Sequence, residues 1–249
     1  MAMPAPLLTL QDIRLTVGTT PLLDGAELFV EAGERLCLVG TFPQLEYPRA
    51  WPAHVKIVGP LIWEPPFGDV ESPTGDAPLV LVAPSTAQDP EHRLLRAALL
   101  GFGSEPVRVL AATNRRPLAR PVKVPANTRM VDWLSYSRTM PQASVVISHA
   151  GHGTVARALE SGCPVVAVPH SGDMGENAAR IDWAGVGVRL PWRLLSPATL
   201  RLAVRRVLDE PILAERARGL SAWAATHDGA STAADLVERL AGIPAANGS

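Results

Sequence analysis

From residue 79 onward, short apolar runs alternate with stretches whose apolar residues recur at helical spacing. The runs are LVLVA (79–83), VRVLAA (107–112), VVIS (145–148) and VVAV (165–168). Short runs of this kind, with amphipathic helices between them, are typical of parallel strands buried on both faces. The expected helices cover residues 90–101, 152–161, 174–184, 196–209, 211–225 and 229–241. This alternation predicts a doubly wound, Rossmann-like α/β domain over residues 76–249.

The first 78 residues lack this regular pattern. Residues 1–40 indicate β structure, with apolar runs at Leu28–Val30 and Leu36–Val39, and TTPLLDG (19–25) predicts a turn. Residues 41–78 hold many of the 24 prolines of the chain. Proline lacks an amide hydrogen and clashes within a helix, so this stretch predicts a connecting segment without regular helix.

Charge and cysteine content narrow the classes of function. The formal net charge of −1 gives no electrostatic reason to expect nucleic acid or an acidic membrane as a partner. No apolar run approaches the roughly 20 residues that span a bilayer, and the N-terminus lacks the basic region of a secretion signal. Cys37 and Cys163 lie in apolar segments and do not suggest a disulfide framework. We therefore expect a cytoplasmic protein.

The sequence HAGHGT (149–154) lies where the run VVIS ends and a helical pattern begins. In parallel sheets, ligands bind beyond the carboxyl ends of the strands. Gly151 and Gly153 would allow a tight turn and the close approach of a ligand. The helix start offers N–H groups that suit a phosphate, and Thr154 and His149 could add a hydroxyl and an imidazole N–H. The residues predict an anion site, although such a turn can also form only a tight corner.

Residues 131–190, VDWLSYSRTMPQASVVISHAGHGTVARALESGCPVVAVPHSGDMGENAARIDWAGVGVRL, resemble the donor-binding domain of GT-B glycosyltransferases. In that family a Trp precedes a turn with the pattern His-x-Gly-x-x-Thr/Ser. This turn is followed by Gly-x-Pro, and then by an Asp-Gln pair that stands before Asn-Ala. A weaker resemblance runs from about Thr41 to residue 241. It implies the C-terminal half of a GT-B fold and transfer of a hexosyl group from a nucleotide sugar to an acceptor hydroxyl.

The resemblance also implies a role for each matching residue. Trp133 would stack on the nucleobase of a UDP- or dTDP-sugar, with a core-edge aromatic as the alternative. The implied diphosphate-binding residues are His149, Gly151, Gly153 and Thr154, with Ser85 and Thr86 in a second turn. The implied sugar-binding residues are Asp173, Met174 and Asn177. Asp173 could also be the N-cap of the following helix, which is compatible with that role, and Asn177 would support the diphosphate site or be a solvated residue of the first helical turn. No metal or cofactor is expected, and the catalytic residues are unknown.

Three positions depart from the family pattern. Tyr136 stands where the family has Gln, and Met174 stands where Gln follows the Asp. Arg157 stands where the family has the Glu that holds the ribose. These departures bear on which nucleotide and which sugar fit. Arg157 could pair with a phosphate or lie on a solvated helix face.

Residues 7–40, LLTLQDIRLTVGTTPLLDGAELFVEAGERLCLVG, resemble the start of ABC-type ATPase domains. The P-loop would need Gly, Lys and Ser or Thr where the chain has Leu45, Glu46 and Tyr47, so ATP hydrolysis is excluded. Residues 41–75 resemble the Pro-rich tail of the glycosyltransferase acceptor domain and its linker. These resemblances predict that the chain joins two segments similar to different families, with the boundary near residue 40.

The acceptor domain of the family carries its catalytic His, and residues 1–40 are too few to form that domain. One alternative is therefore a non-catalytic fusion or truncated product that at most binds nucleotide. Another is a protein similar to sugar-nucleotide epimerases. If the face that the acceptor domain would cover is open, exposed apolar surface predicts self-association.

Overall fold

Six parallel strands form the central sheet, in the order β10-β9-β8-β5-β6-β7. The computed structural model describes residues 8–17, 20–30, 36–65, 67–85, 89–118 and 120–241. The strands are β5 (Leu79–Ala83), β6 (Arg108–Ala112), β7 (Thr128–Val131), β8 (Val145–Ser148), β9 (Val165–Ala167) and β10 (Gly187–Arg189). Counted from β5, this is the Rossmann order 3-2-1-4-5-6, and the order reverses between β5 and β8. The predicted α/β fold class is confirmed.

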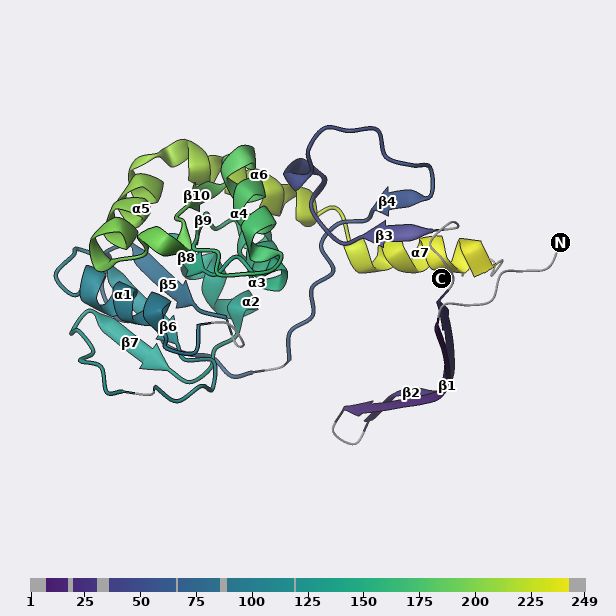
Figure 1. Cartoon of the computed structure of the whole chain (residues 1–249), viewed down its shortest axis with the longest axis horizontal. Coiled ribbons are helices and arrows are strands. Elements are labelled where there is room, and N and C mark those ends of the chain that lie inside the picture. The colour runs from purple at the N-terminus through teal and green to yellow at the C-terminus, as the bar shows by residue number, and fades with distance from the viewer. Residues whose placement is uncertain are drawn as a thin grey trace.

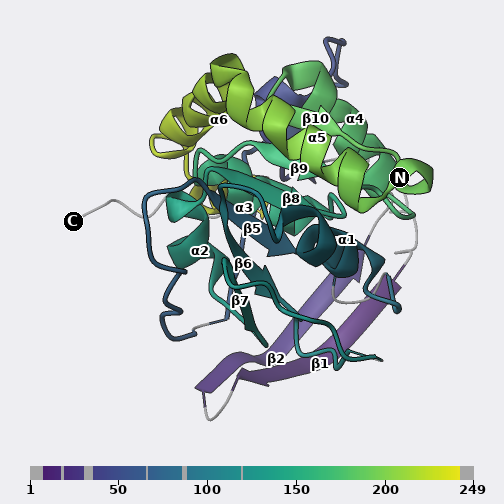
Figure 2. The ribbon, with the colours of Figure 1, turned by 90° about the vertical axis from the view of Figure 1, so that its left-hand side faces the viewer.

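Helices cover both faces of the sheet. Side chains alternate along β5, so that Leu79, Leu81 and Ala83 lie in one core and Val80 and Val82 lie in the other. The first core is covered by α3 (His152–Glu160), α4 (Met174–Ala184) and α6 (Pro211–Ala224), and the second by α1 (Arg93–Phe102) and α5 (Pro197–Asp209). Figure 1 shows the two groups on opposite sides of the strands, and Figure 2 shows the strands in order from β10 to β7.

Three elements of this domain are not predicted by the sequence pattern. They are β7 and β10 at the two edges of the sheet and the four-residue helix α2 (Tyr136–Thr139). No residue of β7 is fully buried, and β10 has only three residues, one of them exposed. Edge strands of this kind need no continuous apolar run, so periodicity does not reveal them.

Helix α1 begins three residues later than expected. The carboxylate of Asp89 accepts hydrogen bonds from the amides of Arg93 and Leu94, at 2.8 and 2.9 Å. These bonds satisfy two of the amides that have no partner within the helix, so the helix begins at Arg93.

The remaining elements lie outside the six-stranded sheet. β1 (Leu8–Val17) and β2 (Thr20–Val30) pair as an antiparallel hairpin, and β3 (Cys37–Val39) and β4 (Val55–Ile57) pair in parallel. The predicted turn at 19–25 is wrong, because residues 20–25 belong to β2; Pro21 is tolerated where only one edge of a strand is paired.

Apart from β4 and a 3-10 turn at Pro43–Leu45, residues 41–78 form a connecting segment without regular α-helix, as predicted. The last helix, α7 (Gly229–Ala241), runs away from the sheet (Figure 1). Among the described residues, no helix is both long enough and apolar enough to cross a membrane.

Candidate functional site

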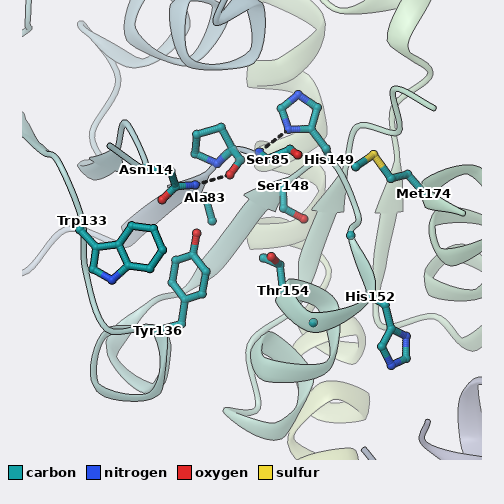
Figure 3. A pocket seen from close by; sticks show the side chains of 13 residues that line it. Ala83, Ser85, Asn114, Trp133, Tyr136, Ser148, His149, His152, Thr154 and Met174 are labelled. Atoms are coloured by element: carbon teal, nitrogen blue, oxygen red, sulfur yellow. Dashed lines mark hydrogen bonds between the residues drawn. The ribbon is translucent and has the colours of Figure 1, made fainter. Parts of the chain in front are cut away.

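A cavity of about 250 Å³ lies at the carboxyl edge of the sheet, between the ends of β5 and β8. Its lining consists of Ala83, Pro84, Ser85, Asn114, Trp133, Tyr136, Ser148, His149, Gly151, His152, Gly153, Thr154 and Met174. This is the switch point of the sheet, where doubly wound folds bind ligands. The cavity therefore brings together the turn 149–154, Trp133 and Ser85, as the sequence predicts (Figure 3).

The turn 149–154 forms one wall of the cavity from backbone. Its left-handed residue is Ala150, with φ of 63°, and α3 begins with Gly151 as N-cap and no side-chain cap. The amides of the first helical turn therefore lack intrahelical partners. Neither Gly151 nor Gly153 has a positive φ, so the turn does not depend on the conformational freedom of glycine. A Cβ at Gly151 or Gly153 would meet no protein atom within 4 Å, so both glycines leave open space.

His149 is buried, and both of its ring nitrogens face protein groups. Nδ1 accepts a hydrogen bond of 2.9 Å from the amide of Ser85, as the dashed line in Figure 3 shows. Nε2 lies 3.4 Å from Oδ2 of Asp89. The expected imidazole N–H toward a ligand is therefore not seen; the N–H faces a carboxylate behind the cavity wall.

Asp89 is a buried carboxylate that the sequence pattern does not single out. Burial alone would raise its pKa, but the adjacent His149 imidazole and hydrogen bonds from the amides of Leu94 and Arg93 outweigh burial, and the pKa is lowered. The backbone φ of Asp89 is 65°, in the left-handed region that Asp tolerates better than most residues. Asp89 is thus ionised and fixed against α1 and His149.

Side chains form the opposite wall. Trp133 is half-buried, with the Arg115 guanidinium 4.7 Å from its ring centroid. The Tyr136 hydroxyl makes a hydrogen bond with the side chain of Asn114, and burial raises the pKa of Tyr136 to about 12. The amide of Asn114 donates in turn to the carbonyl of Pro84. Figure 3 shows Trp133, Tyr136 and Asn114 grouped on one side of the cavity.

Glu64 fixes the start of α2, the helix that carries Tyr136 of this wall. Its carboxylate accepts hydrogen bonds from the amides of Tyr136 and, at 2.9 Å, Ser137, which start α2. Burial raises the pKa of Glu64, but these bonds outweigh burial and lower it overall. Arg157 pairs with Glu160 and lies 3.9 Å from Glu64, with 16% of its side chain exposed. Arg157 therefore binds carboxylates and does not line the cavity, so neither expectation for it is met.

Of the three implied sugar-binding residues, only Met174 lines the cavity. The side-chain amide of Asn177 donates to the carbonyl of Ala150, at 2.9 Å, and to Asp173, at 3.1 Å. Asn177 thus ties α4 to the turn after β8. Asp173 is exposed; it stands at the N-cap position, but its side chain caps no backbone amide of α4.

Several other predicted or missed residues can be placed. Thr86 lies outside the described residues. The ring of His152 is exposed and lies 2.9 Å from the carbonyl of Gly40. Asn114 was missed, although its position directly after a buried strand, at the carboxyl edge, is a signal that could have found it. Asp89 carries a weaker signal, as an acidic residue just before a helix.

The family of the erythromycin biosynthesis protein CIII-like, C-terminal domain matches residues 95–240. The chain belongs to this family. Its relatives include 4'-demethylrebeccamycin synthase from Lentzea aerocolonigenes, 34% identical over 92% of this chain and 55% of that protein. Oleandomycin glycosyltransferase from Streptomyces antibioticus is 29% identical over 69% of this chain and 40% of that protein.

Solved glycosyltransferase structures share the fold of this chain. The calicheamicin glycosyltransferase CalG4 has a TM-score of 0.71 and 28% identity, covering 85% of this chain and 53% of that one. The glycosyltransferase VinC, solved in complex with dTDP, has a TM-score of 0.65 and 23% identity, covering 80% and 50% of the two chains. This chain thus spans about half the length of the relatives it matches.

The match to 4'-demethylrebeccamycin synthase also bears on the N-terminal segment. Because it covers 92% of 249 residues, it includes part of residues 1–40. The resemblance of that segment to an ABC-type ATPase stays a prediction.

Proposed function

We propose that this chain is the donor-binding half of a glycosyltransferase and holds a UDP- or dTDP-sugar. The observation that supports this most is the cavity at the switch point, with one wall of open helix amides and an opposite wall of aromatic side chains. The first wall suits a diphosphate, and the second suits a nucleobase, since every base has a π face that stacks on an aromatic ring.

The proposed diphosphate site consists of the amides of residues 152–154, the hydroxyl of Thr154, and the turn at Ser85 and Thr86. Gly151 and Gly153 leave room for the phosphate oxygens. Among the described lining residues none is Lys or Arg, so the amides and the helix dipole would carry most of the stabilisation of the departing diphosphate. No metal or other cofactor is part of the proposal.

At the nucleoside end, Trp133 would stack on the base. Met174 would touch the sugar from the start of α4, and Asp173 would bind sugar hydroxyls at the rim. Asn177 would act by holding Ala150, and so the turn, in place. The base that activates the acceptor hydroxyl is assigned to no residue of this chain.

A second candidate is nucleotide binding without turnover. It is kept because no residue that lines the cavity is assigned as the base that activates an acceptor hydroxyl. Glycosyl transfer to any acceptor by the purified chain would contradict this candidate and support the first. Hydrolysis or epimerisation of the donor in the absence of acceptor would favour the epimerase-like alternative.

We also propose a cytoplasmic location, self-association and a division of the chain at residues 40 and 75. A cytoplasmic location is supported by Cys37 and Cys163, which are both free thiols. Self-association is supported by exposed apolar side chains such as Trp63, 76% exposed, and Trp183, 48% exposed. The division near residue 75 is supported by the six-stranded sheet, which begins at Leu79, whereas the division at residue 40 separates β3 from β4, which pair with each other.

Titration calorimetry of the full chain with UDP and with dTDP tests the proposed function. We expect saturable binding of at least one nucleotide in the micromolar to millimolar range. The absence of heat with both nucleotides at millimolar concentration would contradict the proposal.

A further inference from the structure

The roles proposed above leave one buried contact of the site unused. The carboxylate of Asp89 is 2% exposed, the imidazole of His149 is 1% exposed, and their nearest atoms are 3.4 Å apart. We propose that Asp89 is a positioning residue for the donor site, which acts through His149 on the backbone amide of Ser85. This inference rests on the proposed function.

The protonation of His149 follows from its partners. The amide of Ser85 can only donate, so Nδ1 of His149 must accept and carries no proton. A neutral imidazole then carries its proton on Nε2, the atom that faces Asp89. Nε2 is buried and makes no hydrogen bond, so the nearby Asp89 carboxylate, 3.4 Å away, stabilises electrostatically the tautomer that Ser85 requires.

Asp89 is itself held rigidly. Its two oxygens accept the amides of Arg93 and Leu94, and its left-handed backbone conformation places the carboxylate between α1 and His149. Non-glycine residues in this conformation are uncommon and persist where the surroundings fix them. The carboxylate can therefore act as a fixed acceptor for the imidazole.

The contacts run from α1 through Asp89 and His149 to Ser85. Ser85 follows β5 and His149 follows β8, so the Ser85–His149 bond ties together the two turns that line the cavity. Without Asp89, no carboxylate would face the buried Nε2–H, and both the tautomer and the tie to Ser85 would weaken. A donor diphosphate would then have to order the turns as it binds, which lowers affinity.

A double-mutant cycle tests this order of action. Asn at position 149 can present its Oδ1 where Nδ1 was, and so keep the bond from Ser85 without any contact to Asp89. The affinity of His149→Asn, whatever its own change, is the reference for the second arm of the cycle. We expect Asp89→Ala to weaken dTDP or UDP binding about tenfold in the unaltered chain, and by less than about twofold in the His149→Asn background.

Two further variants separate positioning from folding. Asp89→Asn keeps an amide oxygen that can accept from His149, so its effect on binding should be smaller than that of Asp89→Ala. Ser196→Ala removes the capping box of α5, which packs on α1. It should lower stability by a similar amount while leaving nucleotide binding unchanged.

Nitrogen NMR of the imidazole gives a readout that a purely structural role would not change. In the free chain, His149 should be protonated at Nε2 alone, and Asp89→Ala should add the Nδ1–H tautomer. Equal losses of affinity from Asp89→Ala in both backgrounds, or an unchanged tautomer, would each overturn the positioning role. If the unaltered chain binds neither nucleotide while the tautomers behave as expected, the proposed function fails and only the contact itself stands.

Discussion

The two walls of the cavity are built in different ways. The wall at residues 149–154 is mostly backbone: helix amides without a side-chain cap, and glycines beside open space. The opposite wall is made of side chains, with Tyr136 bonded to Asn114 and the start of α2 held by Glu64. In the proposed function, the backbone wall serves what UDP- and dTDP-sugars share, the diphosphate, and the side-chain wall serves the nucleoside.

Removing the aromatic ring of Trp133 should have the largest effect on binding. Stacking of a base on an aromatic side chain contributes about 1–3 kcal/mol, so Trp133→Ala should weaken UDP and dTDP binding about 5- to 150-fold. Calorimetry with inorganic pyrophosphate should show an unchanged affinity, because that ligand uses only the backbone wall. Equal losses for nucleotide and pyrophosphate would erase the distinction between the walls.

Filling the open space at Gly153 should separate binding from stability. A Cβ there meets no protein atom within 4 Å, and Ala is about 0.5–1 kcal/mol better than Gly in a helix. Gly153→Ala should therefore unfold at a slightly higher urea concentration. It should bind nucleotide and pyrophosphate about tenfold more weakly, because the added methyl group would displace one or two hydrogen bonds to the phosphate.

Gly219→Ala is the matched control for this substitution. Gly219 lies in α6, where a Cβ also meets nothing within 4 Å, and it does not line the cavity. The same gain in stability with unchanged binding is expected. Nucleotide affinity that stays the same in Gly153→Ala would show that no ligand occupies the space beside α3.

Acid should weaken both walls. The pKa values of Asp89 and Glu64 are lowered in the folded chain, so the stability that each contributes is present above its unfolded pKa of about 4 and is lost as the pH falls through the folded pKa. Urea unfolding between about pH 5 and pH 3 should show this loss. The slope should be shallower in Asp89→Asn and in Glu64→Gln, and an unchanged slope in both would contradict the lowered values.

The sequence predicts the parts of this site that are local. Each buried strand is a continuous run, and HAGHGT follows one of them, so the α/β fold, the turn and its place at the sheet edge follow from short windows. The missed parts depend on residues far apart. Glu64 reaches Tyr136 across 72 positions, and Ser85 reaches His149 across 64. No local pattern shows that an amide from another turn, rather than a ligand, faces the imidazole of His149.

The smallest effect is expected from Tyr136→Phe. It removes one hydroxyl from the side-chain wall and leaves Asn114 its bond to Pro84. A lost neutral hydrogen bond costs about 1 kcal/mol, so stability should fall by that amount and nucleotide affinity should change by less than about threefold. A change in the preference between UDP and dTDP would show that the hydroxyl reads the nucleoside.

The central claim is that the first amides of α3 hold the diphosphate. A crystal structure of the full chain with dTDP or UDP tests this claim most directly. The account predicts phosphate oxygens within about 3 Å of the amides of residues 152–154 and the base against Trp133. A diphosphate bound elsewhere, or this turn closed over by side chains with the nucleotide bound, would contradict the account.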